Sequence, residues 1–295
     1  MSRLRQYASN AERQRAHRAR KRNERPPIVT PFYKGDLVTI YNGDMRAVLA
    51  TLPAESVDVV ITSPPYNLDV AYGSYDDGRA IEDYLAHVRQ WAKALYRAAR
   101  HAGRICLNVP LDTTRPARRF LAGDFAQIFT AEGWTYRTCI IWNEGNVSNH
   151  LARGSVDSPS APNVITPVET LLVFYKGEWI RPANGRSHDL EHSEWLEWTN
   201  GLWTFPGESR PWQKHPAPFP VELPLRCLKL FAYRDDVVLD PFLGSGTTAY
   251  AAQILGRQCI GIELDGEFAR SAADRCNTLF PLTIEAPAPE LAKEA

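Results

Sequence analysis

The sequence lacks any continuous apolar run of about 18 residues, so it predicts no transmembrane helix. Its first residues also lack the apolar segment of a secretory signal peptide. Cysteine is scarce, and the five residues, Cys106, Cys139, Cys227, Cys259 and Cys276, are far apart. That spacing favours neither a zinc ribbon nor a disulfide scaffold. Together these absences predict a cytoplasmic protein with no membrane partner.

A net charge is also lacking, because Lys and Arg balance Asp and Glu over the 295 residues. The charge is unevenly placed, however. Residues 1–25 hold nine Lys and Arg against Glu12 and Glu24, a local charge of +7. We expect residues 1–30 to be a disordered, solvated tail. The alternative is an arm that becomes helical against phosphates. Residues 281–295, rich in Pro and Ala, are also expected to be disordered.

Short apolar runs alternate with segments of helical periodicity along most of the chain. Strands are expected at residues 37–41, 57–61, 104–109, 135–142, 169–175, 237–239 and 258–263. Helices are expected at residues 45–52, 81–101, 120–132, 249–255 and 266–277. The segment 215–232 begins with three prolines, at 216, 218 and 220, and then reads as a further helix. This alternation predicts an α/β fold with a mainly parallel, twisted sheet.

A polar turn follows the expected strand 57–61, and residues 62–67 read Thr-Ser-Pro-Pro-Tyr-Asn. The two prolines remove two backbone N–H donors, so the turn presents acceptors: the carbonyls of Ser63 and Pro64 and the Ser63 hydroxyl. Tyr66 adds a flat aromatic face. Acceptors beside a stacking ring suit a planar base with an exocyclic amino group. The alternative interpretation is a Pro-Pro turn with a core tyrosine.

A glycine-rich turn follows the expected strand 237–239, and residues 240–248 read Asp-Pro-Phe-Leu-Gly-Ser-Gly-Thr-Thr. Glycine lets the backbone approach a ligand, and the following helix places a partly positive end there. Glu263 ends the next strand, where its carboxylate can accept both hydroxyls of a ribose. The nicotinamide pattern is met only loosely, with Ala249 at its third position, and the Gly-Lys-Ser/Thr of a P-loop is absent.

Four segments together resemble motifs of the S-adenosylmethionine-dependent DNA amino-methyltransferases. Residues 63–66 resemble motif IV, residues 240–248 motif I and residues 261–263 motif II. Residues 215–220, His-Pro-Ala-Pro-Phe-Pro, look like motif X. The amino-group motif precedes the cofactor loop, as in the permuted β class of that family. In this order Asp44 stands where motif III commonly meets the adenine end of the cofactor.

The resemblance spans about residues 36–277 and implies a Rossmann-like class I methyltransferase fold with S-adenosyl-L-methionine as cofactor. The catalytic residues it implies are Ser63, Pro64, Pro65 and Tyr66. The cofactor-binding residues it implies are Asp44, His215, Pro216, Phe219, Asp240, Phe242, Gly244, Ser245, Gly246, Thr247 and Glu263. Serine at the first position of motif IV leans toward cytosine N4. Aspartate there would lean toward adenine N6, which stays the alternative.

The chemistry that the resemblance implies rests on orientation. An exocyclic amine is a poor nucleophile, because its lone pair is delocalised into the ring. Acceptors from Ser63 and Pro64 would hold its N–H bonds and direct the lone pair at the sulfonium methyl. The base would leave the DNA helix and stack on Tyr66. A Pro-Cys pair, expected of cytosine-C5 enzymes, does not occur.

We expect one catalytic domain with a small recognition insert. Residues 31–176 form the half with the Ser-Pro-Pro-Tyr site, and residues 215–280 form the cofactor-binding half of the same domain. Residues 177–214 stand where the family places its target-recognition region. Their five tryptophans form either a small core or a DNA-facing surface. The candidates for contacts to base edges are Arg181, Asn184, Arg186 and Asn200, with the loop 143–167 as a second contributor.

Other functions stay open at this point. Residues 188–192, His-Asp-Leu-Glu-His, match an inverted zincin pattern. No strong third ligand accompanies it, so we expect a solvated helix face and no metal. An RNA methyltransferase would share the cofactor loop, and a non-catalytic DNA-binding regulator could use the basic segment. The expected partners are double-stranded DNA, a cognate restriction endonuclease and a second copy of the chain.

Overall fold

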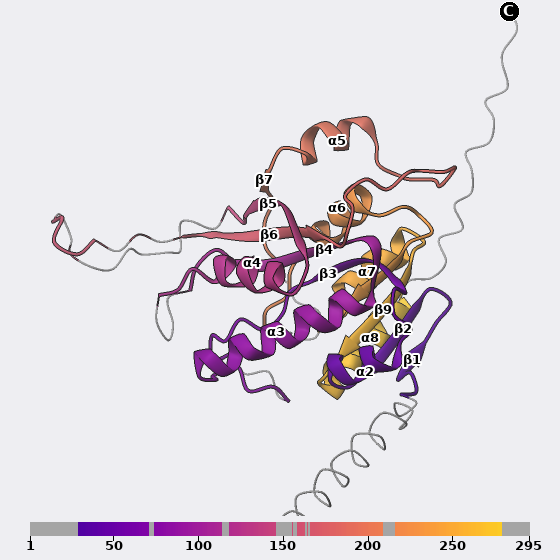
Figure 1. The fold of residues 1–295 in the computed structure, drawn as a ribbon, viewed down its shortest axis with the longest axis horizontal. Helices are drawn as coiled ribbons and strands as arrows, with labels where there is room; N and C mark the ends of the chain where they lie inside the picture. Colours follow the sequence, from indigo (N-terminus) through magenta and orange to yellow (C-terminus); the bar gives the residue numbers. More distant parts are fainter. Residues whose placement is uncertain are drawn as a thin grey trace, which may run out of the picture.

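The computed structural model describes residues 29–70, 74–113, 118–145, 155, 158–162, 164, 166–208 and 216–278. Within these ranges one sheet of nine strands has the order β1-β2-β9-β8-β3-β4-β6-β5-β7 (Figure 1). The strands are β1 (Tyr33–Lys34), β2 (Val38–Asn42), β3 (Val57–Thr62), β4 (Ala99–Pro110), β5 (Thr135–Asn143), β6 (Val168–Tyr175), β7 (Leu202–Thr204), β8 (Val237–Asp240) and β9 (Gln258–Glu263).

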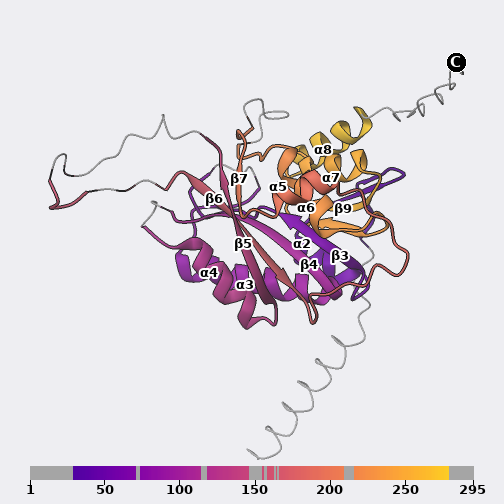
Figure 2. The same cartoon turned by 90° about the horizontal axis from the view of Figure 1, so that it is seen from above.

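The helices pack on both faces of this sheet (Figure 2). They are α2 (Met45–Thr51), α3 (Ile81–Ala98), α4 (Leu121–Ala131), α5 (His192–Trp198), α6 (Glu222–Phe231), α7 (Thr247–Ile254) and α8 (Gly266–Thr278). One core cluster joins the sheet to α2, α3 and α4, and the other joins it to α5, α6, α7 and α8. All six residues of β3 are buried, because helices cover both sides of it.

Five neighbouring strands, β2, β9, β8, β3 and β4, run parallel, and β6 runs antiparallel between β4 and β5. The α/β fold with a mainly parallel sheet is therefore confirmed. Parallel strands end at the same edge, so Asn42, Thr62, Asp240 and Glu263 come together there. The crevice at this edge is where open α/β sheets bind ligands.

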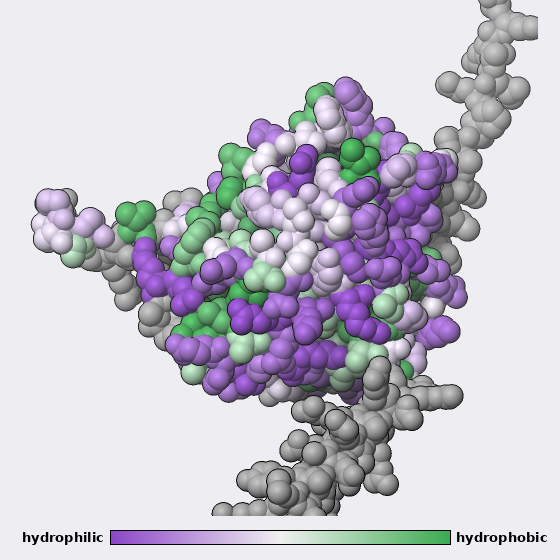
Figure 3. Space-filling model, in the orientation of Figure 1, coloured by the Kyte–Doolittle hydropathy of each residue, from purple (hydrophilic) through white to green (hydrophobic). Residues whose placement is uncertain are grey.

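The surface of the molecule follows the amphipathic pattern of its outer helices. Tyr84, Val88, Trp91 and Leu95 face the core from α3, and the outward side of that helix is mainly hydrophilic (Figure 3). Among the described residues, no helix combines the length and the apolar composition needed to cross a bilayer.

Two of the expected elements differ in the structure. The helix predicted over residues 81–101 ends at Ala98, and β4 begins at Ala99. Gly103 lies within β4, because residues of this strand pair with Lys176 and Tyr175. The helix predicted around residues 188–192 is also wrong: α5 begins only at His192, so the two histidines share no helix face. Asp189 instead forms an ion pair with Arg257.

Candidate active site

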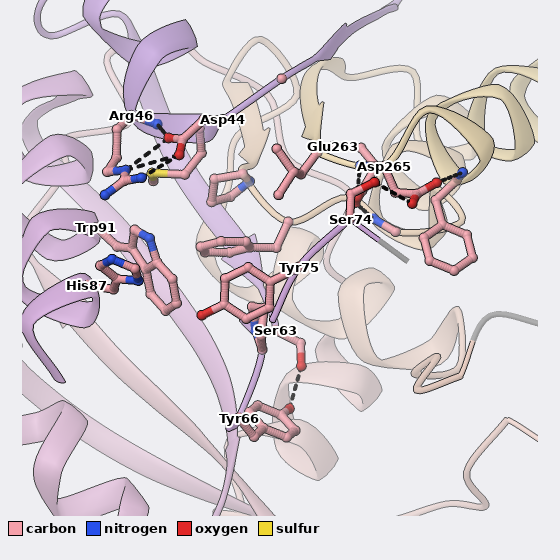
Figure 4. Close-up of a pocket in the computed structure, with 18 of the residues that line it drawn as sticks. Asp44, Arg46, Ser63, Tyr66, Ser74, Tyr75, His87, Trp91, Glu263 and Asp265 are labelled. Carbon is pink, nitrogen blue, oxygen red and sulfur yellow. Dashed lines mark hydrogen bonds and ion pairs between the residues drawn. The ribbon is translucent and has the colours of Figure 1, made fainter. Parts of the chain in front are cut away.

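A first cavity lies at the carboxyl ends of β2, β3, β8 and β9 and has a volume of about 190 Å³. Each strand contributes to its wall through the residues that follow it. Asp44, Ser63, Phe242, Gly244 and Glu263 all line it (Figure 4). Four segments that are distant in the sequence therefore meet at one hollow, at the edge of the sheet that the motifs predicted.

The glycine loop after β8 is held from beneath by a buried carboxyl. Oδ1 of Asp240 accepts hydrogen bonds from Thr62 Oγ1 (2.6 Å) and the Phe242 amide (3.1 Å). Burial raises the pKa of Asp240 to about 6. Asp240 is fully buried and does not line the cavity, so it positions the loop beneath the ligand-facing residues.

The two glycines of the loop have different surroundings. Gly244 has a φ of 54° and lines the cavity. Gly246 has a φ of 86°, and a Cβ there would lie 2.9 Å from the Cβ of Ala272 on α8. Gly246 therefore permits close helix packing, whereas Gly244 permits close approach to a ligand. Ser245 and Thr247 are buried beside it and do not line the cavity.

Glu263 presents a fixed carboxyl group to the first cavity. Its Oε2 accepts from the Gly244 amide (2.7 Å) and its Oε1 from the Asp265 amide (2.8 Å). Burial raises the pKa of Glu263 to about 7, although both amide bonds oppose that shift. A carboxylate oxygen can accept more than one hydrogen bond, so each oxygen retains capacity for a ligand hydroxyl.

Asp44 begins α2 as its N-cap and is tied to Arg46. Its carboxylate accepts from the Arg46 backbone amide (2.7 Å) and from the Arg46 guanidinium. The guanidinium hydrogen bond lowers the pKa of Asp44. Both side chains line the first cavity, so this part of the wall is an ion pair and not a lone carboxylate (Figure 4).

The motifs implied Phe242 but not the other rings of this cavity wall. Trp91 of α3 meets Phe242 edge to face, with ring centroids 4.8 Å apart. His87 and Tyr75 lie beside them (Figure 4). His87 and Trp91 are four residues apart on the expected helix, so they lie on one face of it. That shared face could have marked them as a pair from the sequence alone. Tyr75 follows no strand or motif, and no sequence signal marks it.

Asp265 was also missed, although it stands only two residues after Glu263. Ser74 donates a hydrogen bond to Asp265 Oδ2 (2.8 Å), which brings the segment after β3 against the end of β9 (Figure 4). With flat rings, carboxylates and a glycine without a side chain, the cavity wall suits a nucleoside. Aromatic faces can take its base, and carboxylate oxygens can take its ribose hydroxyls.

A second cavity, of about 520 Å³, adjoins the first. Ser63, Tyr66 and Ala217 line both cavities. The second wall also includes Asn108, from the end of β4, and Glu169, from the start of β6. The Ser-Pro-Pro-Tyr turn therefore stands at the junction of the two hollows.

Hydrogen bonds fix the Ser-Pro-Pro-Tyr turn in place. Ser63 Oγ and the Tyr66 hydroxyl are hydrogen-bonded to each other, and the Tyr66 hydroxyl donates to the Asn108 carbonyl (3.1 Å). The Tyr84 hydroxyl donates to the Pro65 carbonyl (2.9 Å). Pro64 is buried, whereas Tyr66 is half-buried and lines both cavities. Tyr66 thus packs partly on the core and partly faces the hollows.

Three predicted cofactor residues belong to the proline-rich segment before α6. Pro216 and Phe219 line the second cavity and not the first. His215 lies outside the described residues. The segment therefore touches the cavity at Gly244 and Glu263 through Ala217, whereas the predicted residues Pro216 and Phe219 face the second cavity.

The residues predicted to contact base edges lie elsewhere. Arg181 and Arg186 form ion pairs with Asp236, which directly precedes β8. Since β8 reaches the site only at its other end, both arginines stand at the opposite edge of the sheet. Asn184 is exposed in the turn between them, and Asn200 is exposed just before β7. Their guanidinium groups hold the sheet. Their contact with base edges stays a prediction.

The tryptophans of the same segment are divided between core and surface. Trp198 and Trp203 are buried, and the Arg226 guanidinium lies over both rings. Trp195 is exposed, and Trp212 lies outside the described residues. The small-core alternative is therefore confirmed for Trp198 and Trp203.

Known proteins are similar to this chain. The chain is 44% identical over 183 residues to the Type II methyltransferase M.MjaVI of Methanocaldococcus jannaschii, covering 62% of this chain and 93% of that one. It is 28% identical over 264 residues to the Type II methyltransferase M.ScaI of Streptomyces caespitosus, covering 83% of each. TTHA0409 of Thermus thermophilus, solved with S-adenosyl-L-methionine, matches with a TM-score of 0.63 and 28% identity, covering 80% of this chain and 93% of that one.

The model of the DNA methylase family, the N6/N4 methyltransferases, matches residues 57–274, most of the described fold. This match includes the Ser-Pro-Pro-Tyr turn, the glycine loop and Glu263, which the structure places around two adjoining cavities. S-adenosyl-L-methionine is the cofactor of such a site. The chain belongs to the N6/N4 DNA methylase family and is a DNA methyltransferase similar to Type II methyltransferases.

Proposed function

We propose that the chain methylates the N4 amine of a cytosine that has left the DNA helix and entered the second cavity. The observation that carries this proposal is that Ser63 and Tyr66 line both cavities. A methyl donor in one hollow and an amine in the other would then meet at the Ser-Pro-Pro-Tyr turn. The serine of this turn supports cytosine N4, by resemblance, over adenine N6.

The first cavity would hold the cofactor through groups that suit its parts. Glu263 would accept from the ribose hydroxyls, and the rings of Phe242 and Trp91 would flank the adenine. Gly244 leaves room for the chain of the cofactor to pass. When bound there, S-adenosyl-L-methionine supplies an electrophilic methyl group on a sulfonium sulfur.

The turn would orient the amine. The Ser63 hydroxyl accepts one N–H of the base, which favours a tetrahedral nitrogen whose lone pair points into the first cavity. The Tyr66 hydroxyl is held by Ser63 and by the Asn108 carbonyl, so its ring has a fixed direction. A fixed ring beside a cavity of about 520 Å³ gives the base a stacking surface.

The product decides the proposal. Double-stranded DNA of varied sequence would be incubated with the protein and a deuterium-labelled methyl donor, and the digested nucleosides analysed by mass spectrometry. We expect labelled N4-methylcytosine. Labelled N6-methyladenine would move the target to adenine and leave the family unchanged. Labelled 5-methylcytosine, or labelling confined to RNA, would overturn the proposal.

Substitutions at the turn separate its two roles. Tyr66→Ala should weaken binding of DNA with an extruded base by about 1–3 kcal/mol, because a stacking face is lost. Ser63→Ala should lower the methylation rate and leave DNA affinity nearly unchanged, because its acceptor matters most as the nitrogen becomes tetrahedral. Single-turnover rates and DNA titrations measure both effects. A Ser63→Ala/Tyr66→Ala variant at full rate would refute this assignment.

Two partners remain proposals. Type II relatives support a companion endonuclease that cuts the same sequence. DNA methylated by this chain should then resist that endonuclease, and sequencing of the modified bases would give the site. A homodimer is tested by sedimentation with and without DNA. The permuted β-class order also stays a prediction.

A further inference from the structure

Glu169 is a half-buried acid in the second cavity that the motifs do not account for, and protein groups surround its carboxyl. It stands at the start of β6, paired in the sheet with Pro110 of β4 and Trp142 of β5. In the described part of the chain its side-chain hydrogen-bond partners are the neutral groups of Asn108 and Tyr66. Buried carboxyl groups that only stabilise a fold are normally paired with a cation. Glu169 differs from such groups, because the partners named above are neutral. It lines the second cavity, which is proposed to receive the target amine.

A continuous chain of hydrogen bonds joins Glu169 to the Ser-Pro-Pro-Tyr turn. Ser63 Oγ is bonded to the Tyr66 hydroxyl, and the Tyr66 hydroxyl is bonded to the Glu169 carboxyl. Asn108 holds the far end, because its Nδ2 donates to Glu169 Oε2. Its Nδ2 also lies 3.3 Å from the Tyr66 hydroxyl. Hydrogen bonds thus link Ser63, Tyr66 and Glu169 one after the other, from the junction of the two cavities to the carboxyl group.

Amine methylation leaves a proton that must be moved. The target nitrogen forms a bond to the methyl carbon as the bond from that carbon to sulfur breaks, and the bonding pair stays on sulfur. The nitrogen becomes positively charged and regains neutrality by losing one proton. A motif with aspartate has a carboxylate at this place, but the Ser63 hydroxyl is not a base of comparable strength.

We propose that Glu169 is the final acceptor of this proton, which passes from the target nitrogen through the hydroxyls of Ser63 and Tyr66. Ser63 takes the proton from nitrogen and gives its own to the Tyr66 oxygen. The single Tyr66 O–H, which donates to the Asn108 carbonyl in the resting structure, turns to Glu169 and gives its proton to the carboxylate. Both hydroxyls end neutral, and Glu169 becomes a neutral acid. Glu169 thereby acts through other residues and not on the base. The inference rests on the proposed amine methylation.

The surroundings of Glu169 place its titration near neutral pH. Burial raises its pKa to about 7, Glu144 raises it further, and the hydrogen bonds from Asn108 and Tyr66 oppose the rise. Among the described residues, the titratable groups on the same cavity wall are Tyr66, Glu144 and Glu208. Only the ionised carboxylate can take up a proton. The rate of methyl transfer should therefore rise with pH through about 7 and level off above it.

Single-turnover methylation between pH 5.5 and 8.5, with protein in excess over DNA, isolates this step from product release. Glu169→Gln keeps the size of the side chain and its capacity to accept from Asn108. We expect its rate at pH 8 to fall at least ~10-fold and its pH dependence to flatten. DNA and cofactor affinities should stay within about twofold, since the changed group does not contact either directly.

Two further variants make the test independent of that one substitution. Tyr66→Phe keeps the ring but breaks the hydrogen-bond chain, so it should slow methylation and flatten the pH profile as Glu169→Gln does. Glu144→Gln removes a negative neighbour and keeps the chain. It should therefore retain the rise with pH and shift its midpoint to lower pH.

Three results would overturn the inference. The first is a wild-type rate and pH profile in Glu169→Gln. The second is lost DNA binding in that variant with an unchanged rate once DNA is bound, which would mark a purely structural role. The third is a wild-type profile in Tyr66→Phe. Failure of the proposed function is separate, because the wild-type chain would then place no methyl group on a DNA amine.

Discussion

The first cavity and the segment 177–208 contain similar residue types, but their side chains face different surroundings. Both contain aromatic rings and charged side chains. Around the cavity, carboxylates at strand ends and rings from α3 and the loops face a hollow. In the segment 177–208, the guanidinium of Arg181 and the indole of Trp203 face the protein itself. The same residue types thus face a hollow in one region and stabilise the fold in the other.

The difference arises from how far the partners are in the sequence. Gly244 and Glu263 belong to adjacent parallel strands with one intervening helix, so the fold unit itself brings them together. Arg181 and Asp236 belong to segments 55 residues apart. Their pairing depends on where the chain returns to the sheet. A charged residue in an irregular segment therefore has no function that can be assigned before its partner is known.

The largest expected effect comes from breaking the ion pair beneath the segment 177–208. Asp236 is fully buried and accepts two hydrogen bonds from Arg181, at 2.6 and 2.7 Å, and a further one from Arg186. Asp236→Ala leaves two cations with less compensation, so it should reduce the free energy of unfolding by about 3–5 kcal/mol. Urea denaturation of the purified variant measures this loss.

Arg186→Ala is the matched control, because its side chain is 25% exposed against 8% for Arg181. The free energy of unfolding should fall much less in Arg186→Ala than in Asp236→Ala. The sequence that the protein methylates should be the same in Arg186→Ala as in the wild type. A changed methylation sequence would show that Arg186 contributes to DNA recognition. The segment 177–208 would then serve a ligand as well as the fold.

Much of the fold could be predicted because its signals are local. The strand at residues 258–263 and the helix from Gly266 follow apolar periodicity and end where the structure ends them, within one residue. The helix before β4 was overextended, because pairing with neighbouring strands converts residues 99–103 into strand and overrides their helical pattern. Here the backbone hydrogen bonds offered by the neighbouring strands outweigh the local helical propensity.

The candidate site was predictable only in part, for a related reason. Ser63 directly follows β3, Gly244 lies in the loop after β8, and Glu263 ends β9, so motif spacing places all three at the sheet edge. Asn108 and Glu169 also stand at ends of strands, but on β4 and on the antiparallel β6. Only the strand order shows that the start of β6 lies beside the end of β4. Asn108 and Glu169 of the second cavity therefore needed topology, whereas Gly244 and Glu263 of the first needed only motifs.

The two glycines sharpen the comparison within the cofactor region. Gly244→Val should weaken S-adenosyl-L-methionine binding at least ~10-fold, about 1.4 kcal/mol, because the new side chain enters the cavity. Gly246→Val should act mainly on stability, by more than about 1 kcal/mol, because a φ of 86° and the contact with Ala272 both oppose it. Calorimetry and thermal denaturation separate the two effects. Unchanged cofactor affinity in a folded Gly244→Val protein would exclude this loop from the site.

The smallest expected effect is the response of cofactor binding to pH. Burial raises the pKa of Glu263 from its ordinary value near 4.5 to about 7 in the free protein. Ribose hydroxyls donate to the carboxylate more strongly than to the neutral acid, so binding should favour the ionised form. Affinity for S-adenosyl-L-methionine should then fall as pH drops below about 7, by at most ~10-fold per unit, and should be level above pH 8.

The raised pKa of Glu263 changes the stability of the free protein with pH in the opposite direction. A carboxyl group whose folded pKa lies above its unfolded value binds more protons when folded, so its contribution favours the folded state at low pH and declines as pH rises toward 7. Cofactor binding and stability of the free protein should therefore respond to pH in opposite directions around this one residue. Calorimetric titrations at pH 6, 7 and 8, with Glu263→Gln as control, measure the first response. In Glu263→Gln the pH dependence should disappear. If it persists unchanged, another group controls it, and Glu263 is not the residue that receives the ribose.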